Sequence, residues 1–167
     1  MPIMQIKLTE ADYQSTVKTI GRMGKRAKEA AMKEIGATAE DMLADAQMRL
    51  RKNNSIAFSN LVNSGRIEKN EDGYTVSFLT SYAWAVEFGR KAGSIVTVEE
   101  LLSWVKKKLR INNPKMQKTV AYFVSRAIFR FGTKAKPFFY PAYQSSIKGI
   151  TERIAKAIEY TRIKRTK

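Results

Sequence analysis

Apolar and polar side chains alternate over residues 74–79, which predicts a strand whose apolar face is formed by Tyr74, Val76 and Phe78. The residues before it, 66–69, suit a second strand. The turn between the two strands, residues 70–73, ends in the Asp-Gly pair that is typical of β-hairpins. Residues 3–8 alternate more loosely, which indicates a short strand or an extended arm. The pattern therefore predicts a hairpin with one apolar face.

Elsewhere, apolar residues recur every three or four positions, which predicts helices. The longest helix covers roughly Lys25–Lys52. Another opens at Thr97–Glu100, which has the sequence of a capping box, and the next opens at Asn113–Pro114, where Asn can cap the helix and Pro suits its first turn. A last helix begins near Pro141 and carries apolar positions as far as Ile158. A short helix is also expected before the long one, from Thr9 to a break at Gly21–Gly24.

The helix that follows Asn113 is expected to bury one apolar stripe and to end at Gly132; the stripe comprises Val120, Phe123, Val124, Ala127, Ile128 and Phe131. Residues 134–140 are expected to be extended, because Pro137 disfavours a helical residue before it. Together these elements predict an α+β fold, in which a small antiparallel sheet with its hairpin packs against the long N-terminal helix and three further helices. Because no linker or repeat divides the chain, we expect residues 1–167 to form a single domain with a flexible basic C-terminal end.

The composition narrows the possible chemistry. The chain has no Cys and no His among its 167 residues. Disulfides, thiolate zinc sites and every His-dependent triad or metalloprotease site are therefore excluded. No apolar run approaches the roughly 18 residues that a membrane span needs, and the N-terminus lacks the order of a signal peptide. We therefore expect a cytoplasmically made protein that contacts no membrane, uses no cofactor or metal, and is not an enzyme.

The net charge of +16 is distributed unevenly. No Asp or Glu occurs between Glu100 and Glu152, whereas that stretch holds eleven Lys and Arg residues. The predicted basic surface consists of Lys106, Lys107, Lys108, Arg110, Lys115, Lys118, Arg126 and Arg130; Lys134, Lys136 and Lys148 complete the stretch. Such a surface suits DNA phosphates or an acidic partner, although charge runs are also typical of solvated helix faces.

Few carboxylates are placed for chemistry. Asp72 and Glu87, with Lys91 nearby, could be combined into a metal-dependent nuclease, but aspartates are common in turns for conformational reasons. Glu87 lies between Val86 and Phe88, so we expect it to need a partner, with Arg or Lys favoured. Asp41 and Asp45 share a helix face with Arg49, and we expect an Asp45–Arg49 pair rather than a metal site.

Two segments carry a resemblance to a known family. Residues 82–90 read Tyr-Ala-Trp-Ala-Val-Glu-Phe-Gly-Arg, and residues 132–142 contain Pro-Phe-Phe-Tyr-Pro-Ala. Their order and spacing resemble the tail-completion or head–tail joining (neck) proteins of tailed bacteriophages, of the gene-product-ten-like type of lambdoid phages. The family positions fall on Tyr82, Ala83, Val86, Glu87, Phe88, Gly89, Pro137, Phe138, Pro141 and Ala142. Leu61-Val62-Asn63-Ser64 matches a further step of the family pattern, but Ser59-Asn60 replaces the threonine–glycine that usually precedes it.

The resemblance implies a structural virion protein of the neck or tail, assembled as a homo-oligomeric ring, often a hexamer, around the DNA channel. Its implied partners are copies of itself and the neighbouring connector or stopper and tail terminator or tube proteins, with genomic DNA in the channel as a further candidate. The two aromatic–proline segments would then be an internal clamp of the fold or a subunit contact, and we favour the clamp. The alternative is a basic DNA-binding module that contacts phosphates without base specificity.

Overall fold

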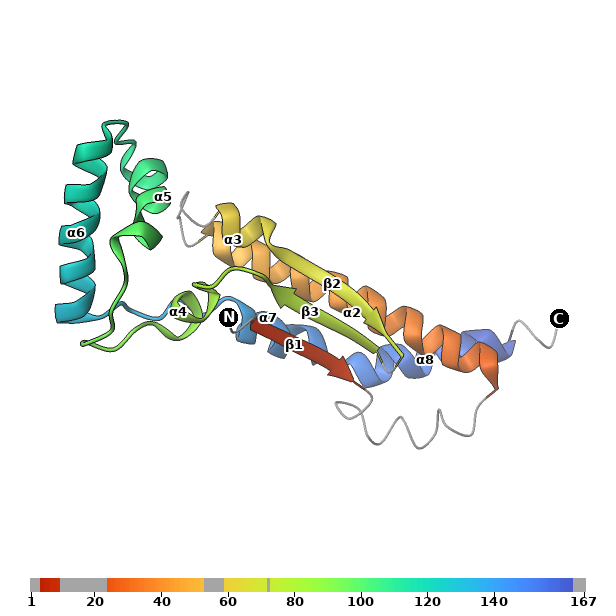
Figure 1. The fold of residues 1–167 in the computed structure, drawn as a ribbon. Helices are drawn as coiled ribbons and strands as arrows, with labels where there is room; N and C mark the ends of the chain where they lie inside the picture. Colours follow the sequence, from red (N-terminus) through yellow and green to blue (C-terminus); the bar gives the residue numbers. More distant parts are fainter. Residues whose placement is uncertain (1–3, 10–23, 53–58, 72, 164–167) are drawn as a thin grey trace.

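The computed structural model describes residues 4–9, 24–52, 59–71 and 73–163. Along the chain its elements are β1 (Met4–Thr9), α2 (Lys25–Lys52), α3 (Ser59–Asn63), β2 (Gly65–Asn70), β3 (Gly73–Phe78), α4 (Ala83–Phe88), α5 (Val98–Leu109), α6 (Pro114–Phe131), α7 (Phe139–Ile147) and α8 (Ile150–Ile163). The short helix predicted after Thr9 and the last four residues lie outside the described part of the chain. The predicted α+β class, with a small antiparallel sheet beside a long helix, is confirmed (Figure 1).

The sheet has three strands in the order β1–β3–β2, and both pairings are antiparallel. Val76 at its centre is aligned with Ile6 of β1 and with Ile67 of β2. The predicted hairpin is therefore present, and the N-terminal segment is a strand of the same sheet rather than a free arm. Val76 and Phe78 are buried, as their alternation predicts.

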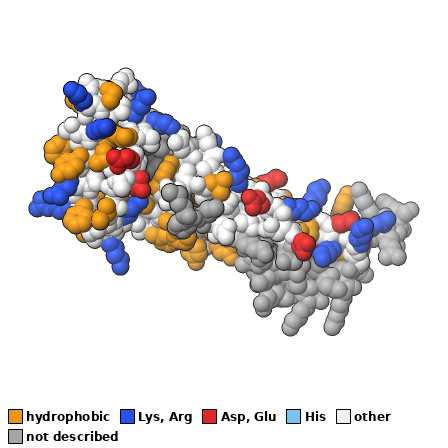
Figure 2. Space-filling view, in the orientation of Figure 1, with side chains coloured by type: hydrophobic (Ala, Val, Ile, Leu, Met, Phe, Trp, Pro, Cys, Tyr) orange, Lys and Arg blue, Asp and Glu red, His pale blue; other side chains and the backbone are white. Residues whose placement is uncertain are grey.

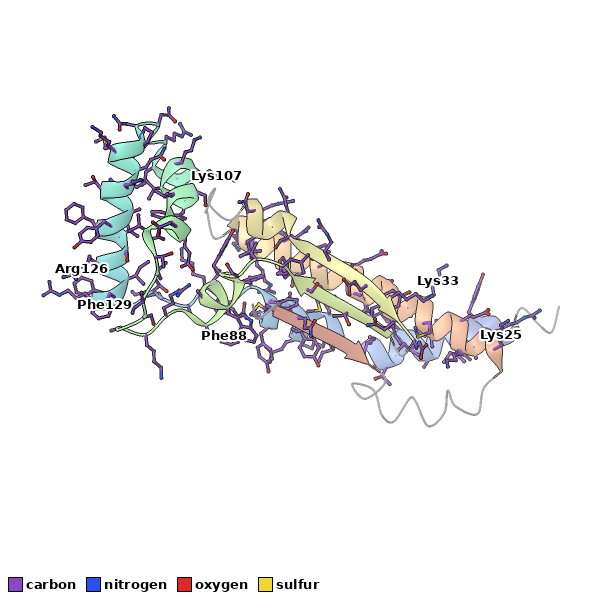
Figure 3. All side chains as sticks on the ribbon, in the orientation of Figure 1. Lys25, Lys33, Phe88, Lys107, Arg126 and Phe129 are labelled. Carbon is purple, nitrogen blue, oxygen red and sulfur yellow. The ribbon has the colours of Figure 1, made fainter. Side chains whose placement is uncertain are left out.

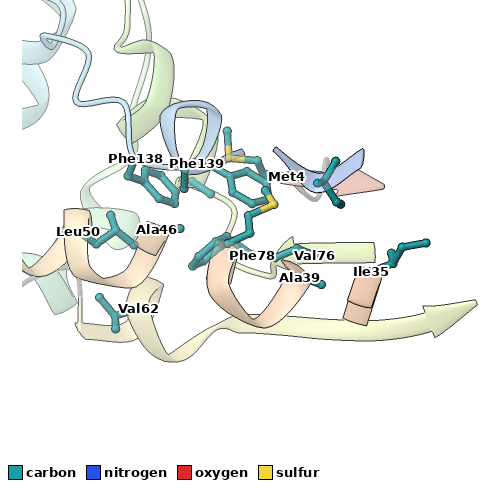
Figure 4. Packing of buried hydrophobic residues seen from close by; sticks show 14 of the residues in the cluster. Met4, Ile35, Ala39, Ala46, Leu50, Val62, Val76, Phe78, Phe138 and Phe139 are labelled. Carbon is teal, nitrogen blue, oxygen red and sulfur yellow. The ribbon is translucent and has the colours of Figure 1, made fainter. Parts of the chain in front are cut away.

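The core forms where α2 meets the sheet and the C-terminal helices α7 and α8. The apolar residues that recur along α2 are buried in the core, or partly buried in the case of Ala27: Ala27, Ala31, Ile35, Met42, Ala46 and Leu50. Figure 4 shows side chains of α2, β3 and α7 converging in this core. The expected Asp45–Arg49 pair is present, with 3.0 Å between the carboxylate and the guanidinium Nε.

The C-terminal region differs from the prediction. The single helix expected from Pro141 is two helices, α7 and α8, which are separated at Lys148–Gly149. Gly149 has a φ of +76°, a left-handed conformation that interrupts a helix and favours glycine. The segment predicted as extended is also shorter, because α7 already begins at Phe139. The basic C-terminal end is helical as far as Ile163.

Two helices lie apart from this core. α5 and α6 pack against each other around the buried Val105 and Ala121, and Figure 1 shows them at one end of the molecule, away from most of α2. We call residues 90–136 the arm and the remainder the body. The main cluster of buried apolar side chains lies entirely in the body, where it stops at Val86 and resumes at Phe138.

Both predicted helix starts in the arm are confirmed. The Thr97 hydroxyl accepts a hydrogen bond from the backbone N–H of Glu100, and the Asn113 side chain accepts from those of Lys115 and Met116. These caps depend only on residues two or three positions away, so the sequence alone is sufficient to predict them. Gly132 ends α6 as expected.

Candidate interaction surface

Glu87 joins the two segments that carry the family resemblance. It lies on α4 with only 2% of its surface exposed, and its two carboxylate oxygens face the start of α7. The backbone N–H groups of Phe138 and Phe139 donate to Oε2 at 2.8 and 2.9 Å, and that of Tyr140 donates to Oε1 at 3.0 Å.

The predicted Arg or Lys partner of Glu87 is therefore wrong. The first N–H groups of a helix have no partner within the helix and carry a partial positive charge, so they can stabilise a carboxylate without any cation. The N-cap residue of α7, Phe138, makes no side-chain capping bond. Glu87 supplies the missing cap from a helix about fifty residues earlier in the chain.

Aromatic rings pack beside this contact. Phe138 and Phe139 are buried, and each lies nearly perpendicular to the ring of Phe78 on β3, with ring centroids 5.1 and 5.2 Å away. Ala83, Val86 and Ala142 of the family positions are also buried, and Tyr82 and Pro141 are partly buried. Together these residues join α4 to the start of α7 and the start of α7 to β3, an arrangement that we call the internal clamp.

Phe88 does not take part in the clamp. Its side chain is 62% exposed and stacks on Trp84, with ring centroids 5.2 Å apart. Tyr140 is exposed as well. The sequence gives no sign that these three rings face outward, because aromatic residues in a short apolar segment are more often buried. The body therefore carries exposed rings close to the clamp.

Two backbone crossings join the arm to the body. Arg90 and Thr133 exchange both of their backbone hydrogen bonds, at 3.0 and 2.9 Å, and the N–H of Lys136 donates to the carbonyl of Val86. Gly89 and Gly132, with φ of +73° and +69°, flank this bridge. A Cβ atom on either glycine would collide with the backbone of the opposite segment. Only glycine at these two positions therefore permits the two backbone segments to approach this closely.

The arm holds most of the net positive charge. Its 47 residues contain twelve Lys and Arg against two Glu, a net charge of +10, whereas the other 120 residues contribute +6. Every residue of the predicted basic surface is exposed and lies on the arm. Figure 2 shows apolar and basic side chains interspersed over this end of the molecule.

The predicted basic surface is not one continuous face. Lys107 on α5 points toward the body, where its ammonium group donates to the side-chain oxygen of Asn60 at 2.7 Å. Arg126 on α6 points in the opposite direction, away from α5 (Figure 3). Lys115 and Lys118 lie near the tip of the arm, at the start of α6. The basic residues thus divide between a side that faces the body and an outer side.

The apolar stripe predicted for α6 is only partly buried. Val120, Val124 and Ile128 are half-buried, but Phe123 and Phe131 are 65% and 74% exposed, and Ala127 is exposed too. The residue that α6 buries completely is Ala121, which the predicted stripe omits. α6 has apolar residues on more than one face, so periodicity alone could not identify the face that packs on α5.

The residues considered for a metal-dependent nuclease do not form a site in the described part of the chain. The described residues contain no group of three carboxylates that could hold a metal ion. Asp72 lies outside them, Lys91 is exposed on the arm, and both oxygens of Glu87 already accept backbone hydrogen bonds. A pocket of about 710 Å³ lies between α2 and α8 and is lined by Ala, by Tyr160 and by both acidic and basic residues, none of which was a predicted site residue.

None of the described helices is long and apolar enough to cross a membrane. The chain matches no model of a known protein family, no curated protein and no solved structure.

Proposed function

We propose that this protein is a structural subunit of a tailed bacteriophage that forms a ring at the head–tail junction or the tail end, as a tail-completion or head–tail joining protein. It is made in the host cytoplasm and works as part of the virion. Its function is geometric rather than catalytic, so the proposal assigns it no reaction, cofactor or metal.

The observation that carries this proposal is the contact between Glu87 and the start of α7. The segments that resemble the neck family are about fifty residues apart in sequence, and this contact makes them a single structural unit. A family pattern that includes both segments would account for their meeting through a buried carboxylate. The unit also holds the base of the arm, because Arg90 directly follows its first segment and Thr133, which pairs with Arg90, comes shortly before its second.

The exposed apolar side chains also favour an assembly of several subunits. Soluble monomers rarely present large contiguous apolar patches, and such patches usually mark contacts with other molecules. Here exposed apolar side chains lie on two different surfaces, Trp84, Phe88 and Tyr140 near the clamp and Ile95 and Phe131 on the arm. A contact between unlike surfaces of identical subunits produces a closed ring when its rotation closes. The faces of this ring that do not contact its own subunits are proposed to bind the neighbouring neck and tail proteins.

Deletion of the gene from the phage that encodes the chain tests this function. We expect filled heads and separate tails to accumulate, and the wild-type gene supplied in trans to restore complete particles. Antibody labelling in electron micrographs should place the chain at the junction or the tail end. Normal particles without the chain, or complete particles that lack it, would refute the proposal. As a matched pair in the rescue, Glu87→Ala should complement poorly and the exposed Glu99→Ala should complement fully.

A DNA-binding module is the second candidate, and the observation that favours it is the concentration of charge on the arm. Such a surface binds phosphates without reading bases, and its affinity falls steeply with salt. Titration of labelled duplex DNA at physiological salt separates the two functions. Tight binding by the isolated chain, together with particles that assemble normally without it, would favour the module.

A further inference from the structure

The outer face of α6 combines cations with exposed aromatic rings. Lys118, Tyr122, Arg126 and Arg130 follow one another at intervals of four residues, so they form a single ridge along the helix. With a rise of about 1.5 Å per residue, successive members are about 6 Å apart along the axis. Phe123 and Phe129 flank this ridge, and both are exposed. We call these six residues the α6 ridge.

The charge of the ridge selects for a polyanion. α6 contains no acidic residue, and the two Glu residues of the arm lie in the first turn of α5. A second copy of the chain is a poor occupant for this face on charge alone, because each copy carries +16. The described part of the body leaves the ridge uncovered, since Arg126 and Phe129 point away from it in Figure 3.

The aromatic rings of the ridge favour single-stranded over duplex nucleic acid. A duplex backbone offers phosphates to the cations but nothing to Tyr122, Phe123 and Phe129, since its bases are already stacked on one another. Unpaired bases can stack on aromatic side chains, whatever their sequence, while neighbouring cations hold the phosphates. The rings of Tyr122 and Phe123 lie in contact with each other, with centroids 5.8 Å apart, so they form an aromatic platform beside Arg126.

We propose that the α6 ridge binds single-stranded nucleic acid, with Lys118, Arg126 and Arg130 on the phosphates and Tyr122, Phe123 and Phe129 against the bases. This binding is independent of sequence and sensitive to salt. It goes beyond the proposed ring function and does not depend on it, because the ridge belongs to the arm of a single chain.

Fluorescence anisotropy with the full-length chain tests the proposal. The probes are a labelled oligothymidylate of about 20 nucleotides and a duplex of the same strand length. Charge alone would favour the duplex, which has the higher charge density. We therefore expect the single strand to bind more tightly than the duplex. Equal or tighter binding of the duplex would overturn the proposal.

Substitutions separate the two parts of the ridge. Phe129→Ala and Tyr122→Ala should each weaken single-strand binding by about fivefold or more and leave duplex binding unchanged. Arg126→Ala should weaken binding of both probes and reduce the salt dependence of single-strand affinity by about 0.7 in the log–log slope. The matched controls lie on the body: Phe88→Ala removes an equally exposed ring, and Lys33→Ala removes an exposed cation (Figure 3).

The outcomes are separable from those of the ring proposal. Normal single-strand affinity of Phe129→Ala and Tyr122→Ala would overturn the contacts with the bases. If the body controls weakened single-strand binding as much as the ridge variants do, the location of the site would be overturned. Binding to anionic phosphatidylserine vesicles in place of oligothymidylate would show that the ridge is a membrane surface and overturn the proposal. Particle assembly is not a readout here, so failure of this inference leaves the virion function untouched. Because the substituted side chains are exposed, circular dichroism should show every variant folded.

Discussion

Glu87 illustrates how a single buried side chain can depend on distant residues. From the sequence, a carboxylate between Val86 and Phe88 needs compensation for its charge, and that much is correct. The nature of the compensation could not be predicted, because the three donating N–H groups belong to a helix whose start depends on the tertiary fold. Sequence patterns report local partners such as the Thr97 cap, whereas Glu87 caps a helix across the core.

Substitution of Glu87 should destabilise the body strongly. Glu87→Ala leaves three N–H groups at the start of α7 without their acceptor, and hydrogen bonds to a charged group contribute about 1.5–3 kcal/mol. We expect the free energy of unfolding, measured with urea, to fall by about 3 kcal/mol or more. Glu87→Gln retains one acceptor and should lose less. Glu99→Ala on the exposed start of α5 serves as control and should stay within about 0.5 kcal/mol of wild type.

Tyr82 gives the fold a dependence on alkaline pH. Burial of its ring raises the pKa of the phenol above the usual value of 10.0, and a backbone hydrogen bond at Leu61 partly offsets this rise. The unfolded chain therefore releases this proton at a lower pH than the folded chain does. Its contribution to stability is present in full below about pH 10 and is lost as the pH rises through the folded-state pKa. Tyr82→Phe should reduce the fall in stability above pH 10, and an unchanged pH profile would contradict this assignment.

At the level of elements, the sequence was sufficient to predict helices and strands in which the spacing of apolar residues repeats several times. The hairpin and α2 follow from such repetition. The division between α7 and α8 was missed because apolar residues keep a helical spacing across it, at Ile147, Ile150 and Ile154. The orientation of α6 was also missed, since its Phe residues face outward while smaller residues face α5. Periodicity identifies an amphipathic element, but the partner decides which face is covered.

The junction glycines allow a test at this level. Gly132→Ala combines a left-handed backbone with a collision against the carbonyl of Arg90, so the Arg90–Thr133 bridge must open. We expect a loss of several kcal/mol in the free energy of unfolding, or a locally opened junction with faster amide exchange at Arg90 and Thr133. Gly93, in the connection between α4 and α5, is the matched control. Its φ is +88°, but nothing lies within 4 Å of an added Cβ, so Gly93→Ala should cost about 1–2 kcal/mol. Equal effects of the two substitutions would show that the collision is unimportant.

At the scale of the whole molecule, charge and packing are separated. The body contains the main apolar core, whereas the arm has a net charge of +10 and buries only a few small side chains of its own. The composition gave the excess of positive charge, and the order of residues located it in the second half of the chain. It could not predict that this stretch would project from the body, because that depends on how the chain crosses itself at Arg90 and Thr133.

This separation predicts that the body folds without the arm. Arg90 and Thr133 are hydrogen-bonded neighbours, so residues 91–132 can be replaced by a short Gly-Ser linker without moving the ends of the cut. Since the main core receives no side chain from the arm, the shortened chain should unfold in one cooperative transition, as followed by circular dichroism. It should also lose its affinity for oligothymidylate and fail to restore particles. The Lys107–Asn60 contact is among the interactions removed, and as an exposed hydrogen bond it contributes about 1 kcal/mol. A shortened chain that cannot fold would show that the arm stabilises the body through its base, and the two parts would then be one cooperative unit.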